Sequence, residues 1–348
     1  MDRKLPPHSL GVNVAVRSTS VSSARLALAL AASLSSAVPA RAGEWTFHGW
    51  EPPAAYTGDV GLRFWYGKGN TGKNLYDPSG SFLVSRLTYN NLSIFSAEGF
   101  ARFDLNTGWF LKGLIGGGGF RKGTLTDEDF PPGIAPYSAT LSVLDNSFPL
   151  YASVDAGYNL LRGPDFRLGA FAGYHFLREV VSAQGCNQIA ANPFICGFVP
   201  VPGTVKVITQ DNTWEALRIG LDGAVDITSR LKLSVDAAWL PFVWLNGTDA
   251  HWLRISSFPG DFSGPVPEDG TGWGYQLEGI LSYRVTDALS VGVGGRYWHM
   301  QTKGLTHFEG HISGFAALPQ PVDWKTDNYG VFLQTSLKFG PYPVISSN

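Results

Sequence analysis

The sequence predicts an all-β fold, a ten-stranded antiparallel transmembrane β-barrel with long extracellular loops and short periplasmic turns. Three observations predict it: an export signal, strands with one polar and one apolar face, and connections that alternate between short and long. The composition agrees, because 42 glycines and 13% aromatic residues with 2 methionines are typical neither of a helical membrane protein nor of a cytosolic enzyme. The 26 basic and 28 acidic residues nearly balance, so the charge gives no sign of nucleic acid as a partner.

The N-terminal residues 1–42 have the features of a signal peptide. Two arginines precede the apolar run LALALAASL at 26–34, and AVPARA after it carries alanine at both positions that signal peptidase prefers. A transmembrane helix needs ~20 apolar residues, so this run is too short to span a bilayer. We therefore expect cleavage before Gly43 and export of residues 43–348 as one barrel domain; the alternative is the start of a buried helix.

The two cysteines fit an exported protein. Cys186 and Cys196 lie in the Pro-containing stretch GCNQIAANPFICG, which joins two expected strands. In an oxidising compartment we expect a disulfide that closes this loop and serves as a structural staple, not as a redox centre.

The strands are recognised by their alternation. In LKLSVDAAWLPFV, residues such as Leu231, Leu233 and Val235 are apolar, whereas Lys232 and Asp236 between them are polar. The stretches WEALRIGLDGAVDI, GYQLEGILSYRV and LSVGVGGRYW repeat this pattern. A soluble sandwich would also alternate, but glycines and ionisable residues that share one narrow face favour a barrel with a polar lumen and a lipid-facing outside.

The connections set the number of strands. Short turns are expected at 106–108, 162–165, 228–230 and 286–288, and long polar loops near 70–80, 125–138, 185–204, 252–271 and 309–327. An even number of strands is what a single-chain bacterial barrel requires. The ten expected strands span 56–69, 81–105, 109–124, 139–161, 166–184, 205–227, 231–251, 272–285, 289–308 and 328–339.

The seventh expected strand, 231–251, is longer than a membrane requires. At ~3.3 Å per residue it extends ~70 Å, and at a ~40° tilt it rises ~50 Å, about twice the ~25 Å apolar band of such barrels. The barrel should therefore stand well above the outer leaflet. Asp127, Asp129 and the stretch NGTDAHW at 246–252 fall at loop-side strand ends, and hence on the extracellular rim.

Two short motifs on this rim resemble the omptin family of outer-membrane proteases, which are ten-stranded barrels. The chain has Asp127-Glu128-Asp129 after its third expected strand and Asp249-Ala250-His251 at the end of its seventh. The omptins carry an Asp-x-Asp and an Asp-x-His pair at those places. FRLGAFAGYHFLR and SRLTYNNLSIFSAEGFARFDL are similar to the family's fifth and second strands. The resemblance implies an Asp/His endopeptidase of the cell surface.

Physical chemistry is consistent with that activity. A histidine near pKa ~6.5 can take a proton from water at neutral pH when a carboxylate orients its ring, which assigns these roles to His251 and Asp249. Asp127 and Asp129 would hold the water from across the lumen and share a proton, because neighbouring carboxylates raise each other's pKa. Alternation continued from Leu231, however, places the Asp-x-His pair on the lipid side, unless a bulge near Pro241 or at 246–247 shifts the strand. The alternative is that all four are solvated rim residues.

The sequence departs from the family in its specificity residues. Where the omptins have acids that select basic side chains, Lys73, expected in the first loop, and Gly247 stand here, so a preference for dibasic sites is not expected. The family also depends on lipopolysaccharide; Tyr174 and Arg178 match the ends of that motif, with Phe176 where an acid is usual. We therefore expect lipopolysaccharide as an activator and no metal.

Two functions remain open at this point. The first is an omptin-like endopeptidase in the outer membrane of a Gram-negative bacterium, a monomer in contact with membrane lipid, lipopolysaccharide and peptide or protein substrates, with its active site outside. The second is a non-enzymatic adhesin or narrow pore. Lumen residues such as Lys232, Asp236, Glu278 and Arg296 distinguish them: an enzyme needs them to plug the lumen, and a pore needs them to line an open channel.

Overall fold

The computed structural model describes residues 56–130, 135–192, 194–258, 261–308 and 318–340. The expected signal peptide, 1–42, and the expected first mature residue, Gly43, lie outside the described residues. Within the described residues, no helix is long and apolar enough to cross a membrane. The described helical structure is one 3-10 turn, η1 (Trp252–Arg254).

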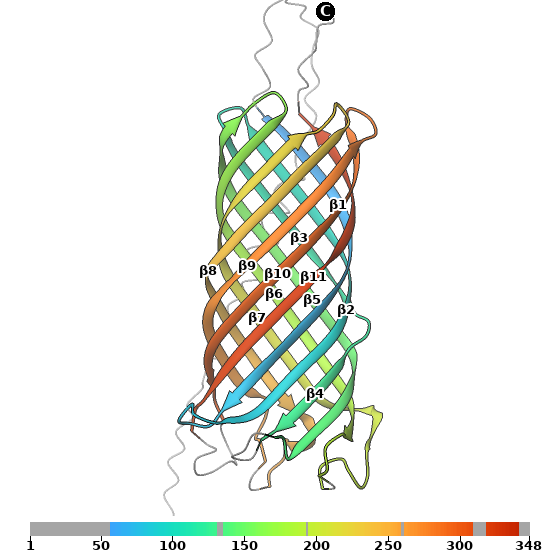
Figure 1. Ribbon diagram of the computed structural model, residues 1–348, viewed down its shortest axis with the longest axis vertical. Helices are drawn as coiled ribbons and strands as arrows, with labels where there is room; N and C mark the ends of the chain where they lie inside the picture. The colour runs from blue at the N-terminus through green and yellow to red at the C-terminus, as the bar shows by residue number, and fades with distance from the viewer. Residues whose placement is uncertain (1–55, 131–134, 193, 259–260, 309–317, 341–348) are drawn as a thin grey trace, which may run out of the picture. The chain divides into compact units, whose positions relative to one another are not determined.

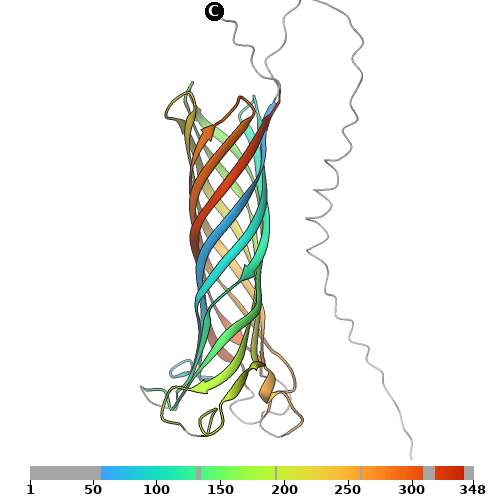
Figure 2. The same ribbon diagram turned by 90° about the vertical axis from the view of Figure 1, so that its right-hand side faces the viewer.

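The described strands form a closed antiparallel ring, as predicted (Figures 1 and 2). The third position in the ring is shared by two segments, β3 and β4, which both pair with β2 on one side and β5 on the other. The ring therefore has ten positions. It closes because β1 pairs with both β2 and β11. The segments are β1 (Tyr56–Tyr76), β2 (Leu83–Leu105), β3 (Trp109–Phe120), β4 (Thr124–Asp129), β5 (Ser138–Arg162), β6 (Phe166–Gln188), β7 (Val201–Asp226), β8 (Leu231–His251), β9 (Val266–Arg284), β10 (Leu289–Thr306) and β11 (Gln320–Phe339).

Short turns gather at one end of the barrel and long loops at the other, as predicted (Figure 1). Several strands extend further towards the loop end than expected: β1 continues to Tyr76, β9 begins at Val266 and β11 begins at Gln320. The third strand was also expected to end at residue 124, but β4 continues it to Asp129. Above the apolar band no lipid selects apolar side chains for the outer face, so these segments have the composition of polar loops although they pair as strands.

The predicted disulfide is confirmed. Cys186, near the end of β6, is bonded to Cys196 in the following loop, with their Cα atoms 5.8 Å apart. It holds the backbone that follows β6 close to the loop end of the barrel.

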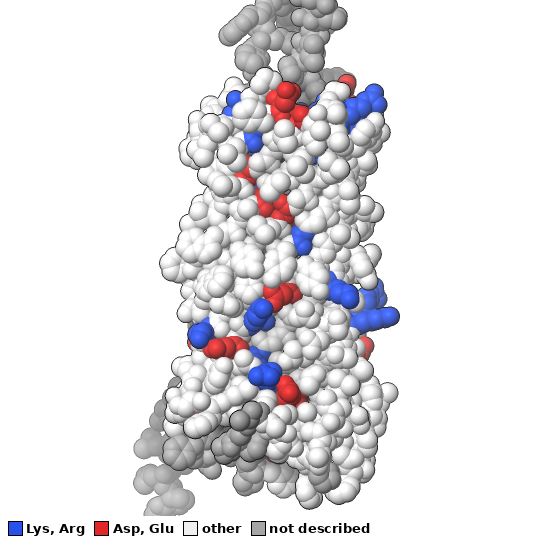
Figure 3. Space-filling view, in the orientation of Figure 1, with Lys and Arg blue, Asp and Glu red and all other residues white. Residues whose placement is uncertain are grey.

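An apolar belt with aromatic rings at both edges covers the outer wall. Residues between the edges, such as Leu62, Ile115 and Val293, are about half exposed. In Figure 3, Lys and Arg side chains protrude from the wall in the loop-side half, the lower half of the view, while in the half nearer the turns charged atoms lie at the rim and in a narrow line down the middle of the view. Such a belt is what a bilayer requires. Exposed aromatic residues near the turns are Tyr56, Phe103, Trp109, Tyr158, Phe166, Tyr283 and Phe339, and those at the opposite edge are Tyr66, Phe95, Phe148, Tyr174, Trp239, Phe242, Trp244, Trp273 and Tyr329.

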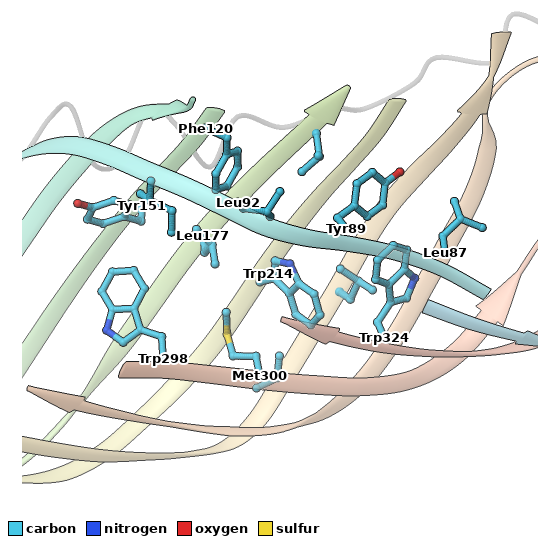
Figure 4. Close-up of a cluster of buried hydrophobic side chains, with 14 of the residues drawn as sticks. Leu87, Tyr89, Leu92, Phe120, Tyr151, Leu177, Trp214, Trp298, Met300 and Trp324 are labelled. Atoms are coloured by element: carbon cyan, nitrogen blue, oxygen red, sulfur yellow. The ribbon is translucent and has the colours of Figure 1, made fainter. Parts of the chain in front are cut away.

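The middle of the lumen is filled with apolar side chains. Tyr151, Trp214 and Met300 come from different strands, point inwards (Figure 4) and have no exposed surface. Leu240 is fully buried as well. Gly116 makes room for this packing, because a Cβ there would lie 2.5 Å from the ring of Tyr151. A water-filled channel would expose its lining, so among the described residues this cluster plugs the barrel.

Charged side chains fill the lumen on the turn side of the plug. Arg296 contacts both Glu98 and Glu278 at 2.6 Å, and Arg218 contacts Asp236 at 3.1 Å. A cavity of about 220 Å³ remains there, lined by Arg218, Asp236 and Glu278 and by others such as Lys232. Of the lumen residues expected to distinguish an enzyme from a pore, Asp236, Glu278 and Arg296 are thus held in ion pairs on the turn side of the plug.

Candidate active site

A bulge in β8 turns the Asp-x-His pair towards the lumen. Against β9, the register of β8 shifts between Leu240 and Val243, where Pro241 lies. Leu240, before the bulge, and Val243, after it, are both buried, so the inward face changes from even to odd positions. Asp249, with 4% of its surface exposed, is thereby placed inside the barrel. A bulge is thus present near Pro241, one of the two places considered for it, and Asp249 is not merely an exposed residue above the lipid.

Asp249 and His251 form a hydrogen-bonded pair at the loop end of the lumen. His251 Nε2 lies 2.9 Å from Asp249 Oδ2, and about a fifth of the histidine side chain is exposed. Burial alone would raise the pKa of Asp249, but His251 and Lys73 outweigh it and hold that pKa below its ordinary value. The carboxylate is therefore ionised, and Nε2–H donates to it, so Nδ1 is the ring nitrogen that can receive a proton.

The same contacts act on the histidine. Burial would lower the pKa of His251, but the charge and hydrogen bond of Asp249, together with the charge of Asp127, raise it above the ordinary value. A ring nitrogen of raised basicity, held by a carboxylate, is a suitable proton acceptor near neutral pH.

The acidic pair lies on β4, which the register places between β2 and β5. Asp127 is opposite Leu87 and Thr140, and Asp129 is opposite Ser85 and Ser138. All four neighbours are buried residues of the lumen face. The register thus puts both carboxylates on the inner wall, as the Asp-x-Asp spacing predicted.

Asp127 is the more perturbed of the two carboxyls. Its Oδ1 is buried and has no hydrogen-bond partner among the described residues. Burial raises its pKa to about 7, with His251 opposing and Asp129 adding to the rise. Burial raises the pKa of Asp129 as well. At neutral pH Asp127 can therefore either hold or release a proton, and it shares an electrostatic field with the histidine on β8.

Glu128, between the two aspartates, points to the outside. It is opposite Arg86 in the ladder, and the two side chains approach to 3.7 Å on the outer wall. Glu128 is thus a natural control for its neighbours, since it has the same charge on the same strand but lies outside the lumen.

Lys73 and Glu268 belong to the site but were missed as site residues. Lys73 was expected in a loop, and it is instead a buried residue of β1 whose Nζ lies 2.6 Å from Asp249 Oδ2. It also contacts Glu268 Oε1 on β9. The region around Glu268 was expected to be a loop, yet the alternation of Val266, Glu268 and Gly270 inwards with Pro267 and Asp269 outwards is a strand signal.

Aromatic side chains border the histidine. The ring of Phe262, from the loop after β8, lies edge-on to His251 at 5.7 Å, and Phe308 stacks on Phe262 at 5.8 Å. Arg254 lies 4.6 Å from the centre of the Phe262 ring. These side chains limit access of water to one side of His251.

The residues expected to bind lipopolysaccharide lie together on the outer wall. Tyr174 and Arg178 are both on β6 and point outwards. The Tyr174 hydroxyl donates to Glu215 at 2.5 Å, and Arg178 makes two hydrogen bonds, of 2.9 and 2.7 Å, to Asp211. Among the described residues, no group of three or more His, Cys, Asp or Glu side chains is arranged to hold a metal ion.

Comparison with known proteins shows the fold. No protein-family model matches this sequence, and no curated protein matches it significantly. Among solved structures, the chain is similar to the outer membrane protease OmpT from Escherichia coli, with a TM-score of 0.62 and 19% identity over 82% of this chain and 96% of that one. It also matches the outer membrane protein OprG from Pseudomonas aeruginosa, with a TM-score of 0.34 and 10% identity over 83% of this chain and 98% of that one.

A further match is the toluene transporter TbuX from Ralstonia pickettii, with a TM-score of 0.33 and 10% identity over 84% of this chain and 90% of that one. The last two scores are too low to support any inference. The likeness to OmpT, at its low identity, shows the barrel architecture alone. The described part of the chain is an all-β barrel of the outer-membrane type.

Proposed function

We propose that this barrel is an endopeptidase that hydrolyses peptides or proteins at its loop end. The observation that carries the proposal is the hydrogen bond of 2.9 Å between His251 Nε2 and Asp249 Oδ2. His251 is partly exposed, and the charge of Asp127 raises its pKa. Within the described residues, one buried oxygen of Asp127 has no hydrogen-bond partner. A base, an orienting carboxylate and a second carboxyl near the same point are the groups that water-mediated hydrolysis needs.

The reaction proceeds by direct attack of water. His251 Nδ1 accepts a proton as the water oxygen bonds to the peptide carbonyl carbon, and Asp249 stabilises the resulting imidazolium. Asp127 hydrogen-bonds to the same water or to the oxyanion, according to whether it is ionised or protonated. Collapse of the tetrahedral intermediate breaks the C–N bond, and the imidazolium returns its proton to the leaving nitrogen.

The filled lumen supports an enzyme over a pore. Trp214 and Met300 have no exposed surface, so the described part of the barrel offers no water path past them. It is instead a rigid wall that holds residues from β4 and β8 in fixed positions, as a hydrolytic site requires. If no hydrolysis is found, the function that remains is that of a non-enzymatic adhesin.

The site lies above the apolar belt. Lys73 is seven residues beyond Tyr66 of the loop-side aromatic edge, ~23 Å along the strand and ~18 Å in height at a ~40° tilt. We propose that the loop end faces the outside of a Gram-negative outer membrane, that the chain acts as a monomer, and that lipopolysaccharide contacts Tyr174 and Arg178. To test the last point, the activity of the refolded protein is measured with and without lipopolysaccharide. We expect lipopolysaccharide to raise the activity, and to raise it less in an Arg178→Ala variant.

The endopeptidase is tested with a diverse peptide library. The refolded protein is incubated with the library and lipopolysaccharide, and new peptide ends are identified by mass spectrometry. We expect cuts by the parent and by Glu128→Ala, and no cuts above background by His251→Ala. A library left intact by the folded parent would exclude the proposal for peptides.

A further inference from the structure

Lys73 occupies a closed cage of opposite charge. Its Nζ contacts Asp249 Oδ2 at 2.6 Å and also Glu268 Oε1, and it lies 5.5 Å from the centre of the Trp324 ring. The lysine and both carboxylates have no more than 5% of their side chains exposed. Two carboxylates and an indole face are the groups that bind an ammonium ion in proteins.

The cage is held in place by further hydrogen bonds. Glu268 Oε2 accepts hydrogen bonds from Gln210 Nε2 at 3.1 Å and from Trp324 Nε1 at 3.0 Å. Both oxygens of Glu268 are therefore engaged, one by Lys73 and one by its neighbours on β7 and β11. A carboxylate fixed in this way keeps its position if the ammonium group is removed.

One carboxylate oxygen of the cage also binds the proposed base, His251. Asp249 Oδ2 accepts hydrogen bonds from His251 Nε2 and from Lys73 Nζ, so the histidine and the ammonium group bind the same carboxylate oxygen. A cationic side chain in the cage would therefore lie beside His251. Lys73 already fills that place from within the chain.

We propose that Lys73 is a specificity-determining residue: it is an internal cation that fills the cage of Asp249, Glu268 and Trp324 and so excludes lysine and arginine side chains of substrates from it. This inference rests on the proposed endopeptidase for its substrate consequence, while the cage itself does not depend on catalysis. Because the ammonium group of Lys73 already lies between the two carboxylates, a second cation would meet a like charge at close range.

The cage can be emptied and refilled. Lys73→Ala keeps Cβ and removes three carbons and the ammonium group, which together correspond to n-propylammonium. Lys73→Met fills nearly the same volume without charge, and Lys73→Ala/Glu268→Gln removes one wall of the cage. The uncharged analogue 1-propanol separates charge recognition from the filling of a cavity.

Binding is measured by thermal unfolding of the refolded proteins. We expect n-propylammonium at millimolar concentration to raise the unfolding midpoint of Lys73→Ala by several degrees and to leave the parent, Lys73→Met and the double variant unchanged; 1-propanol should have no effect. If Lys73→Ala does not fold alone, refolding in n-propylammonium should restore the heat-modifiable barrel. Absence of both effects would overturn the cage.

Cleavage provides the second measurement. For peptides that differ only in Lys or Leu beside the cut, we expect the Lys:Leu rate ratio of Lys73→Ala to exceed that of the parent by about tenfold or more. An unchanged ratio contradicts the role in specificity. If no variant cleaves peptides but n-propylammonium binds Lys73→Ala, the cage stands and the endopeptidase is wrong. If the parent cleaves peptides but the amine does not bind, the inference about Lys73 is wrong.

Discussion

Replacement of Asp127 by asparagine should lower activity and, at high pH, increase stability. Within the described residues, one oxygen of this carboxyl is buried without a hydrogen-bond partner, and burial raises its pKa from the ordinary 3.8 to about 7. Well below pH ~4 the carboxyl is protonated in both the folded and the unfolded chain. As the pH rises towards 7, the unfolded chain releases the proton while the folded one retains it, so stability falls and the full loss remains above pH 7.

The size of the effect follows from these two pKa values. They differ by about 3 pH units, which at ~1.4 kcal/mol each sets an upper bound of ~4 kcal/mol on the loss of unfolding free energy. Because the residue is only partly buried, solvent screening reduces this bound, and we expect ~2 kcal/mol. Asparagine does not ionise and escapes this loss, but it cannot share a proton with the attacking water.

The assay is equilibrium urea unfolding of parent and Asp127→Asn in lipid vesicles at pH 4 and pH 8. The comparison of the two pH values cancels any constant effect of the amide. We expect the variant to gain ~2 kcal/mol relative to the parent between pH 4 and pH 8, while its turnover at pH 7 is lower by ~10²-fold. Glu128→Gln, on the outer wall beside Arg86, should show neither change. If the stability difference between the variant and the parent is the same at both pH values, burial does not raise the pKa of Asp127 and the reasoning is wrong.

The other predictions concern the base and the plug. His251→Ala should lower turnover by ~10²-fold or more with unchanged heat-modifiable migration, and Glu128→Ala should leave both as in the parent; the reverse result would move the site elsewhere. Because Asp249 raises the pKa of His251, Asp249→Asn should shift the acidic limb of the pH–rate profile to lower pH, and an unshifted limb contradicts the pair. The parent should not conduct ions in planar bilayers, whereas Trp214→Ala, which removes a fully buried ring of the plug, should leak; an open parent would favour the pore.

The sequence was sufficient for the barrel because lipid imposes a strict rule on each strand that crosses it. Outward positions such as Leu233 and Val235 must be apolar, so alternation identified the strands, and the short turns fixed their order. This rule does not apply to the parts of the strands that lie outside the lipid. Above the belt, outward residues such as Asp269 and Asp323 are polar, so the outer face no longer carries the apolar signal of a strand, and the strands there were taken for loops.

The candidate site was predictable in part for similar reasons. Two motifs on known strands predicted which faces should meet, and Pro241 marked where a bulge could turn the second motif inwards. The contact of Lys73 with Glu268 joins β1 to β9 across 195 residues. Because neither residue belongs to a motif, and both were taken for loop residues, only the closed barrel brings them together.

The central claim is that His251, oriented by Asp249, activates water for peptide hydrolysis. The most direct measurement is single-turnover cleavage of a peptide taken from the library, carried out in ¹⁸O-labelled water with the parent and with His251→Ala. We expect the parent to place one ¹⁸O atom in each new carboxyl group, with no covalent peptide–enzyme intermediate, and the variant to be slower by ~10²-fold or more. Cleavage by His251→Ala at the parent's rate, or a peptide covalently bound to the parent, would contradict the claim.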